Sequence, residues 1–97
     1  MTGLPETEAG WLEFVRNYAR YRKWRTMHPL RSDGTEPGWP DLTLCRPPRL
    51  VISELKTERG RVSPAQRNWL ADLQACRTLE VYLWRPTQRP EVLEVLT

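Results

Sequence analysis

GWPDLTLCRPPRLVISELKTERG, residues 38–60, decides the fold of this chain. Two apolar runs, over 41–45 and 50–55, have the character of β-strands, and an Arg-Pro-Pro-Arg connection joins them. Asp41 opens the first run, and Glu54 lies at the end of the second, two residues before Lys56. Charged side chains on core strands are costly unless they are paired or hold a metal, so these three residues require a physical explanation.

Strand geometry predicts how these three side chains are placed. Residues two apart on an extended strand point to the same side, so Glu54 and Lys56 project together. If the two strands pair as a hairpin, the carboxylate of Asp41 approaches that of Glu54. Two neighbouring carboxylates repel each other unless a divalent cation bridges them or one takes up a proton. The alternative is purely structural, with Lys56 in a salt bridge to Glu54 and Asp41 capping a turn.

The remainder of the chain predicts helices around this hairpin. Apolar residues recur at helical spacing over 8–22, and Ser63-Pro64-Ala65-Gln66 has the capping box and first-position proline of a helix that runs to about residue 75. Residues 24–28 and 79–84 indicate strands, residues 89–96 a short helix, and Pro and Gly mark a loop over 29–40. The order α-β-β-β-α-β with a short C-terminal helix predicts an α/β fold with a mixed sheet flanked by helices, in a single domain over residues 1–97.

Each of the two longer helices carries one polar residue toward the predicted sheet. At 100° per residue, Glu8 lies in line with the apolar residues Leu12, Val15 and Ala19. An acid in the first turn also suits the helix dipole, so Glu8 has a structural explanation as well. Gln66 closes the capping box and also shares a face with the apolar residues of its helix, which aims it at the sheet near Lys56.

Composition excludes several classes of protein. With 39% apolar and 28% charged residues, the chain has the composition of a globular protein, and no run of eighteen apolar residues predicts a membrane span. The N-terminal residues lack the basic and apolar regions of a signal peptide, and Cys45 and Cys76 are expected to be reduced core thiols. Lysine occurs only at Lys23 and Lys56, and every other cation is arginine. Arginine suits phosphate binding, although a GC-rich genome would produce the same bias.

His28 is the only histidine, which limits the possible chemistry. A zinc site with several imidazoles is impossible, and so is a nucleophile–His–acid triad that does not use His28. Hard oxygen ligands without imidazole or thiolate favour Mg²⁺ or Mn²⁺ instead. His28 itself is expected to be a strand or loop residue without a chemical role.

Four stretches of the chain form a recognisable pattern: Gly38-Trp39-Pro40-Asp41, Glu54-Leu55-Lys56-Thr57, Gly60-Arg61-Val62-Ser63-Pro64-Ala65-Gln66 and Val81-Tyr82-Leu83-Trp84-Arg85-Pro86. A Thr-Glu-Ala stretch at residues 7–9 precedes the first predicted helix. Together these motifs resemble those of the VRR-NUC (virus-type replication-repair nuclease) domain, a branch of the PD-(D/E)xK superfamily with the restriction-endonuclease fold. The resemblance spans nearly the whole chain and looks like the stand-alone form found in phages and bacteria.

The resemblance implies a phosphodiesterase that depends on Mg²⁺ or Mn²⁺. It implies that Asp41, Glu54 and the backbone carbonyl of Leu55 bind the metal with help from Glu8. Lys56 would orient or activate the attacking water, and Gln66 would support the lysine.

DNA is the expected partner. The arginines that flank the motif (Arg59, Arg61 and Arg67) could hold backbone phosphates, and no base-reading element is evident, so branched DNA such as a four-way junction is the expected substrate. A single site per chain and five tryptophans favour a homodimer, and the expected location is the cytoplasm of a bacterium or a phage-infected cell. The alternative is a nucleic-acid-binding protein that keeps the nuclease fold without cutting.

Overall fold

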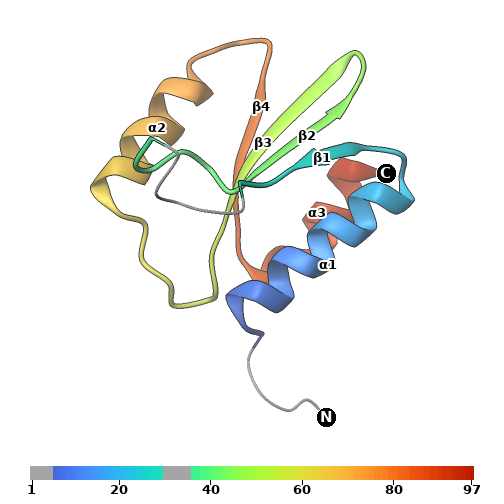
Figure 1. The fold of residues 1–97 in the computed structure, drawn as a ribbon, viewed down its shortest axis with the longest axis horizontal. Helices are drawn as coiled ribbons and strands as arrows, with labels where there is room; N and C mark the ends of the chain where they lie inside the picture. The colour runs from blue at the N-terminus through green and yellow to red at the C-terminus, as the bar shows by residue number, and fades with distance from the viewer. Residues whose placement is uncertain (1–5, 30–35) are drawn as a thin grey trace.

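A computed structural model describes residues 6–29 and 36–97, and its elements follow the predicted order (Figure 1). Helix and strand boundaries differ from the sequence prediction by at most one residue, and part of the loop predicted over 29–40 lies outside the described residues. The elements are α1 (Glu8–Tyr21), β1 (Arg25–Met27), β2 (Leu42–Arg46), β3 (Arg49–Leu55), α2 (Pro64–Gln74), β4 (Glu80–Trp84), a 3₁₀ turn η2 (Pro86–Gln88) and α3 (Arg89–Leu96).

The sheet is mixed, as predicted, with the strand order β1-β2-β3-β4. β2 and β3 form an antiparallel hairpin in which Leu42 pairs with Ser53, so that one step further along the register Asp41 lies opposite Glu54. β3 and β4 run parallel, and α2 provides the crossover that a parallel pair requires. The carboxyl ends of β3 and β4 therefore lie beside each other, next to the start of β2.

The two faces of the sheet are covered by different helices (Figure 1). α1 and α3 pack on one face, and α2 lies on the other. The hydrophobic core forms on the α1–α3 face, and the indole N–H groups of Trp11 and Trp24 donate hydrogen bonds to the carbonyl oxygens of Trp84 and Leu96, both at 3.0 Å. Its fully buried members include Trp11, Val15, Ala19, Leu42, Leu44, Val51, Leu55, Trp84, Val92 and Leu96.

Three sequence predictions about side-chain placement need correction. The buried stripe of α1 consists of Trp11, Val15 and Ala19, whereas Leu12, which was expected on the apolar face, is only half-buried. Cys76 lies beyond the end of α2 and is exposed, and Cys45 is half-buried, so neither is a core thiol. These differences arise because a sequence pattern predicts only which side of a helix or strand faces the core. How fully each side chain on that side is buried depends on how the element packs in the folded protein. Within residues 6–29 and 36–97, none of the helices has the length and hydrophobicity needed to span a bilayer.

Candidate active site

A glycine turn brings the start of β2 against α2. Gly38 has a φ of 88°, and a Cβ at this position would lie 2.4 Å from the backbone of Ala65, so only glycine allows this close approach. The ring of Trp39 packs edge-on against Trp69 of α2 with centroids 4.9 Å apart, and the Trp69 indole N–H donates to the Pro37 carbonyl at 3.1 Å. The loop before Asp41 and the N-terminal turn of α2 are thus held together.

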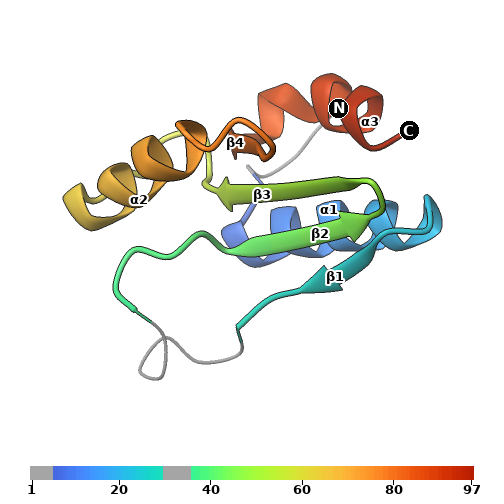
Figure 2. The ribbon, with the colours of Figure 1, turned by 90° about the horizontal axis from the view of Figure 1, so that it is seen from above.

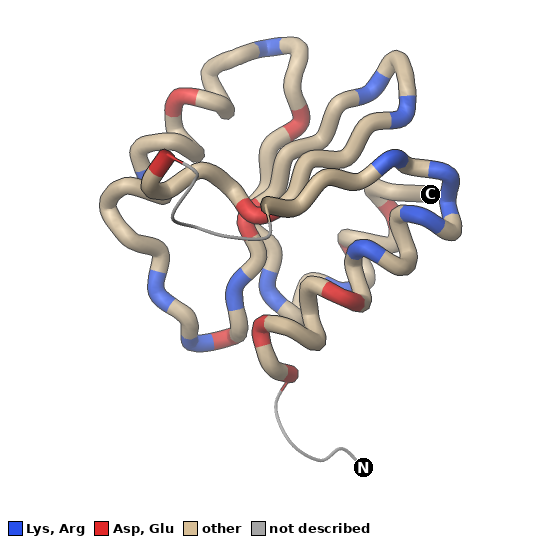
Figure 3. The backbone as a smooth tube through the Cα atoms, in the orientation of Figure 1, with Lys and Arg blue, Asp and Glu red and all other residues tan. Residues whose placement is uncertain are grey.

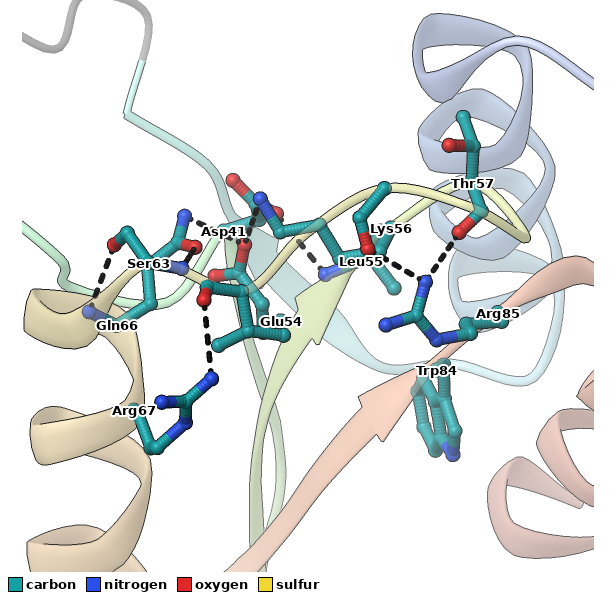
Figure 4. A network of polar contacts seen from close by, with 12 residues as sticks. Asp41, Glu54, Leu55, Lys56, Thr57, Ser63, Gln66, Arg67, Trp84 and Arg85 are labelled. Carbon is teal, nitrogen blue, oxygen red and sulfur yellow. Dashed lines mark hydrogen bonds and ion pairs between the residues drawn. The ribbon is translucent and has the colours of Figure 1, made fainter.

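The predicted charged side chains converge where β2 begins and β3 ends (Figure 4). Glu54 is 1% exposed, and its Oε2 lies 3.6 Å from Nζ of Lys56. Asp41 accepts a hydrogen bond at Oδ2 from the backbone N–H of Leu55, at 3.0 Å. The hairpin register therefore places an acid from each strand and the lysine at one point, as the alternation of the sequence predicts.

Burial and crowding change the acidity of Glu54. Desolvation, together with the neighbouring carboxylate of Asp41, raises the pKa of Glu54 from 4.5 to about 8, and the nearby ammonium of Lys56 only partly offsets this increase. The carboxyl of Glu54 therefore binds its proton more tightly than a solvated glutamate does. A bound cation would favour the carboxylate form and displace that proton.

Gln66 closes the capping box as predicted, but its amide contacts Glu54 and not Lys56. Its Oε1 accepts from the N–H of Ser63 at 2.8 Å, which completes the capping box with the Ser63 side chain. Its Nε2 donates to Oε2 of Glu54 at 3.0 Å. Gln66 therefore orients the carboxylate, whereas the sequence analysis expected it to support Lys56.

Glu8 is not brought together with the paired acids. It is exposed in the first turn of α1, a helix that covers the sheet face opposite to the one toward which Glu54 points. No group of three or more His, Cys, Asp and Glu side chains within residues 6–29 and 36–97 could hold a metal. In this structure Glu8 acts as a first-turn acid, which was the structural alternative.

The predicted arginines lie around the segment that leaves β3. Arg59, Arg61 and Arg67 are all exposed. Arg61 and Arg67 line a shallow hollow at the start of α2, whereas Arg59 lies outside its wall. Arg85 also lines this hollow, and the sequence analysis did not assign it a role.

Arg85 fixes the segment that follows Lys56. Its Nη1 donates to the carbonyl oxygen of Thr57 at 2.6 Å (Figure 4). The same Nη1 also donates to the carbonyl oxygens of Glu58 and Gly60 at 3.2 and 2.8 Å. The Glu58 carboxylate in turn accepts from the N–H of Thr87 at 2.7 Å. Arg85 comes directly after β4, the strand that runs parallel to β3, and therefore lies beside the end of β3. Its position directly after Trp84 at the end of that strand was the sequence signal that could have placed it near the site.

His28 lies in the loop after β1, as expected from the sequence, and its ring contacts the backbone at the site. Its Nδ1 lies 2.7 Å from the carbonyl oxygen of Asp41, so the ring hydrogen-bonds the backbone of the candidate metal ligand. Nothing in the sequence spacing identifies this contact, because the two residues are thirteen positions apart and a loop separates them.

The donor set at this site fits a hard divalent cation. Oε1 of Glu54 is buried and has no hydrogen-bond partner among the described residues, although buried carboxylate oxygens are nearly always satisfied. The carboxylate of Asp41 and the backbone carbonyl of Leu55 come from the same corner of the sheet. Oxygen ligands of this kind suit Mg²⁺ or Mn²⁺.

A mixed sheet with an acid on each strand of a hairpin, and a lysine two residues after the second acid, defines the PD-(D/E)xK class of nuclease folds. Within that class, the chain belongs to the VRR-NUC domain family, whose model matches residues 15–88. This is a family of nucleases that generally depend on divalent metals. Glu8 lies outside the matched residues.

A solved structure described as a VRR_NUC domain protein is similar to this chain with a TM-score of 0.70, covering 96% of this chain and 87% of the other. The sequence identity is 18%, so the similarity concerns the fold. None of the curated proteins matches the chain.

Proposed function

We propose that this protein is a divalent-metal-dependent DNA endonuclease that hydrolyses phosphodiester bonds in branched DNA, with four-way junctions as the leading substrate. The observation that carries the proposal is the buried carboxylate of Glu54, which lies beside Asp41 and Lys56. One of its oxygens has no hydrogen-bond partner among the described residues. An apolar residue at position 54 would stabilise this end of the sheet at least as well as a buried carboxylate, so stability alone does not explain Glu54.

The side chains of Asp41 and Glu54 and the carbonyl of Leu55 would hold the cation. A cation bound there supplies Lewis-acid stabilisation of negative charge on the phosphate and lowers the pKa of water. Gln66 keeps Oε2 of Glu54 in place through its hydrogen bond, which leaves Oε1 available as a ligand.

Lys56 is the candidate for positioning the nucleophile. Its Nζ is within 3.6 Å of Glu54, and its side chain is 13% exposed, so the ammonium group is held at the edge of the site. From there it orients the attacking water and offsets the charge that develops on the phosphate oxygens. Arg85 keeps the following segment in place by its three carbonyl contacts, so the lysine is anchored on both sides.

Exposed arginines next to the site are proposed to hold the DNA backbone. Arg59, Arg61 and Arg67 can contact phosphates and would give an affinity that depends on salt and little on sequence. No base-reading group is evident at the site among the described residues, and selection by shape would favour branched DNA over a defined sequence.

Cleavage of a substrate panel tests the proposal. Labelled four-way junction, fork and plasmid DNA are incubated with Mg²⁺, with Mn²⁺ and with EDTA, using wild-type protein and the Asp41→Asn variant. Metal-dependent cutting of the junction by wild type alone is expected. Junction binding without cutting in any metal would instead identify a binding protein on a nuclease fold.

We also propose a homodimer acting on cytoplasmic DNA, because one site per chain cuts one strand and a junction is resolved by two cuts. The tryptophan content gives less support to this proposal than expected: Trp11, Trp24 and Trp84 are buried in the core, and Trp39 packs on Trp69. Sedimentation is expected to show twice the 11.5 kDa mass of one chain at micromolar concentration. A monomer that still resolves junctions would contradict the proposed assembly.

A further inference from the structure

A group of cations lies at the end of the molecule remote from the candidate active site. Figure 3 shows Lys and Arg segments gathered where α1 turns into β1 and where β2 turns into β3, and Figure 2 shows both turns at the same end of the sheet. Strand pairing explains this, because Arg25 pairs with Cys45, and Arg46 with Arg49. We call this surface the cationic end; it consists of Arg20, Arg22, Lys23, Arg25, Arg46 and Arg49.

Most of these charges have no acidic partner among the described residues. Arg49 forms a bidentate ion pair with Glu80 at 2.6 and 2.7 Å. Arg46 donates to the carbonyl oxygens of Arg22, Leu96 and Thr97, at the ends of α1 and α3. No ion pair joins the remaining four cations to a carboxylate within residues 6–29 and 36–97. The segments 18–27 and 44–50 contain no Asp or Glu at all.

Lys23 has a lysine side chain at a backbone position that favours glycine. It adopts a φ of 73°, in the left-handed region where glycine is the unstrained residue after a helix. A β-carbon there costs about 1–2 kcal/mol. The side chain is exposed and no described contact repays this cost, so the fold itself would be served better by glycine.

Compensation of the helix dipole does not account for the whole group. A cation stabilises the end of a helix only within its last turn. Arg46 already donates to the terminal carbonyls of both helices that end here. Lys23 and Arg25 lie beyond the C-cap of α1, which is Arg22, and Arg25 belongs to the next strand.

The separation from the candidate active site points to a distinct contact. β3 runs from Arg49 at the cationic end to Leu55 at the candidate site, and six residue steps of about 3.3 Å give roughly 20 Å. A shallow hollow at the cationic end is lined by Arg20, Tyr21, Arg22, Lys23 and Arg46, and the Tyr21 ring is 74% exposed beside these charges. Arginine and lysine side chains at such a surface recognise phosphate oxygens.

We propose that the cationic end binds the phosphate backbone of a second duplex arm while the first arm occupies the active site. This inference rests on the proposed function, and it supplies a physical basis for preferring branched DNA. The two surfaces lie at opposite ends of β3, so a junction can present a separate arm to each of them. Selection by shape then follows from the spacing of two charged surfaces and requires no contact to a base.

The test uses Lys23→Gly, because this variant removes the charge and relieves the backbone. Affinity is measured in EDTA over a series of salt concentrations, for a four-way junction and for a linear duplex of equal total length. For the junction, we expect weaker binding and a log–log salt slope smaller by about 0.9, the value of one lost phosphate contact. Lys23→Arg should restore both. Arg77→Ser, which removes an exposed cation from the α2–β4 connection, is the matched control.

The melting temperature separates binding from folding. Lys23→Gly should melt at or above the wild-type temperature, so that a loss of affinity cannot be attributed to unfolding. Unchanged junction affinity, or an equal loss on the linear duplex, would overturn the second-arm contact. Because these measurements need neither metal nor cleavage, they remain valid even if the protein does not cut DNA.

Discussion

The two faces of the sheet use the same strands for opposite purposes. β3 directs Val51 and Leu55 into the dry core beneath α1 and α3, and it directs Glu54 toward α2. On the core face, two buried indoles donate to backbone carbonyls and fix the helices. On the α2 face, a buried carboxylate has one oxygen without a hydrogen-bond partner among residues 6–29 and 36–97. The core face therefore contributes mainly to stability, and the α2 face carries the candidate chemistry. On the α2 face, burial of the Glu54 carboxylate is energetically unfavourable.

This comparison predicts the largest effect for a matched pair of tryptophans. Trp11 is fully buried on the core face and Trp69 is half-buried on the α2 face, yet each indole N–H donates to a carbonyl at about the same distance, 3.0 and 3.1 Å. Trp11→Ala should lower the free energy of unfolding by about 3–5 kcal/mol, because it leaves a cavity in the core. Trp69→Ala should cost clearly less, as measured by urea denaturation. Equal losses would show that the two faces contribute alike.

The second prediction concerns chemistry on the α2 face. Lys56→Ala should lower the single-turnover cleavage rate by about 10²–10³, or roughly 3–4 kcal/mol of transition-state stabilisation, while Mn²⁺ and DNA binding remain. If Lys56 instead serves only its ion pair with Glu54, the variant should lose stability and keep its rate. Thermal melts measured alongside cleavage distinguish the two cases.

The third prediction follows from the raised pKa of Glu54. Between pH 4.5 and about 8 the unfolded chain loses the Glu54 proton while the folded protein retains it, so the free energy of unfolding falls as the pH rises. Below pH 4.5 both states hold the proton and the contribution vanishes. Glu54→Gln removes this dependence, so in EDTA its stability relative to wild type should increase from pH 5 to pH 8. A constant difference in chemical denaturation midpoints across this range would contradict the burial argument.

The smallest effect is expected at Gln66, which serves both the helix and the site. Gln66→Ala removes the hydrogen bond to Glu54 and half of the capping box, and should cost about 1 kcal/mol of stability. Gln66→Glu keeps an acceptor for the capping box but places a carboxylate beside Glu54. If Gln66 orients Glu54 as a metal ligand, Gln66→Ala should also lower the affinity for Mn²⁺, measured by calorimetry, in addition to lowering stability. Unchanged affinity would limit its role to the helix cap.

The order and type of the elements could be predicted from the sequence because each depends on local physics. Period-two and period-3.6 patterns, the Ser63 capping box and the Arg-Pro-Pro-Arg connection all act within a few residues. The convergence of Asp41 with Glu54 was also predictable, since a tight hairpin determines its own register.

The sequence by itself therefore determined the α/β fold, the hairpin and the pair of acids with their lysine. Only the tertiary structure decided that Glu8 stays apart, that Gln66 contacts Glu54, and that Arg85 and His28 hold the backbone around the site. It also decided that the cations of two turns form one surface at the opposite end. These features join segments far apart in the chain, and their geometry depends on how helices cover the two faces of the sheet, which no local pattern specifies.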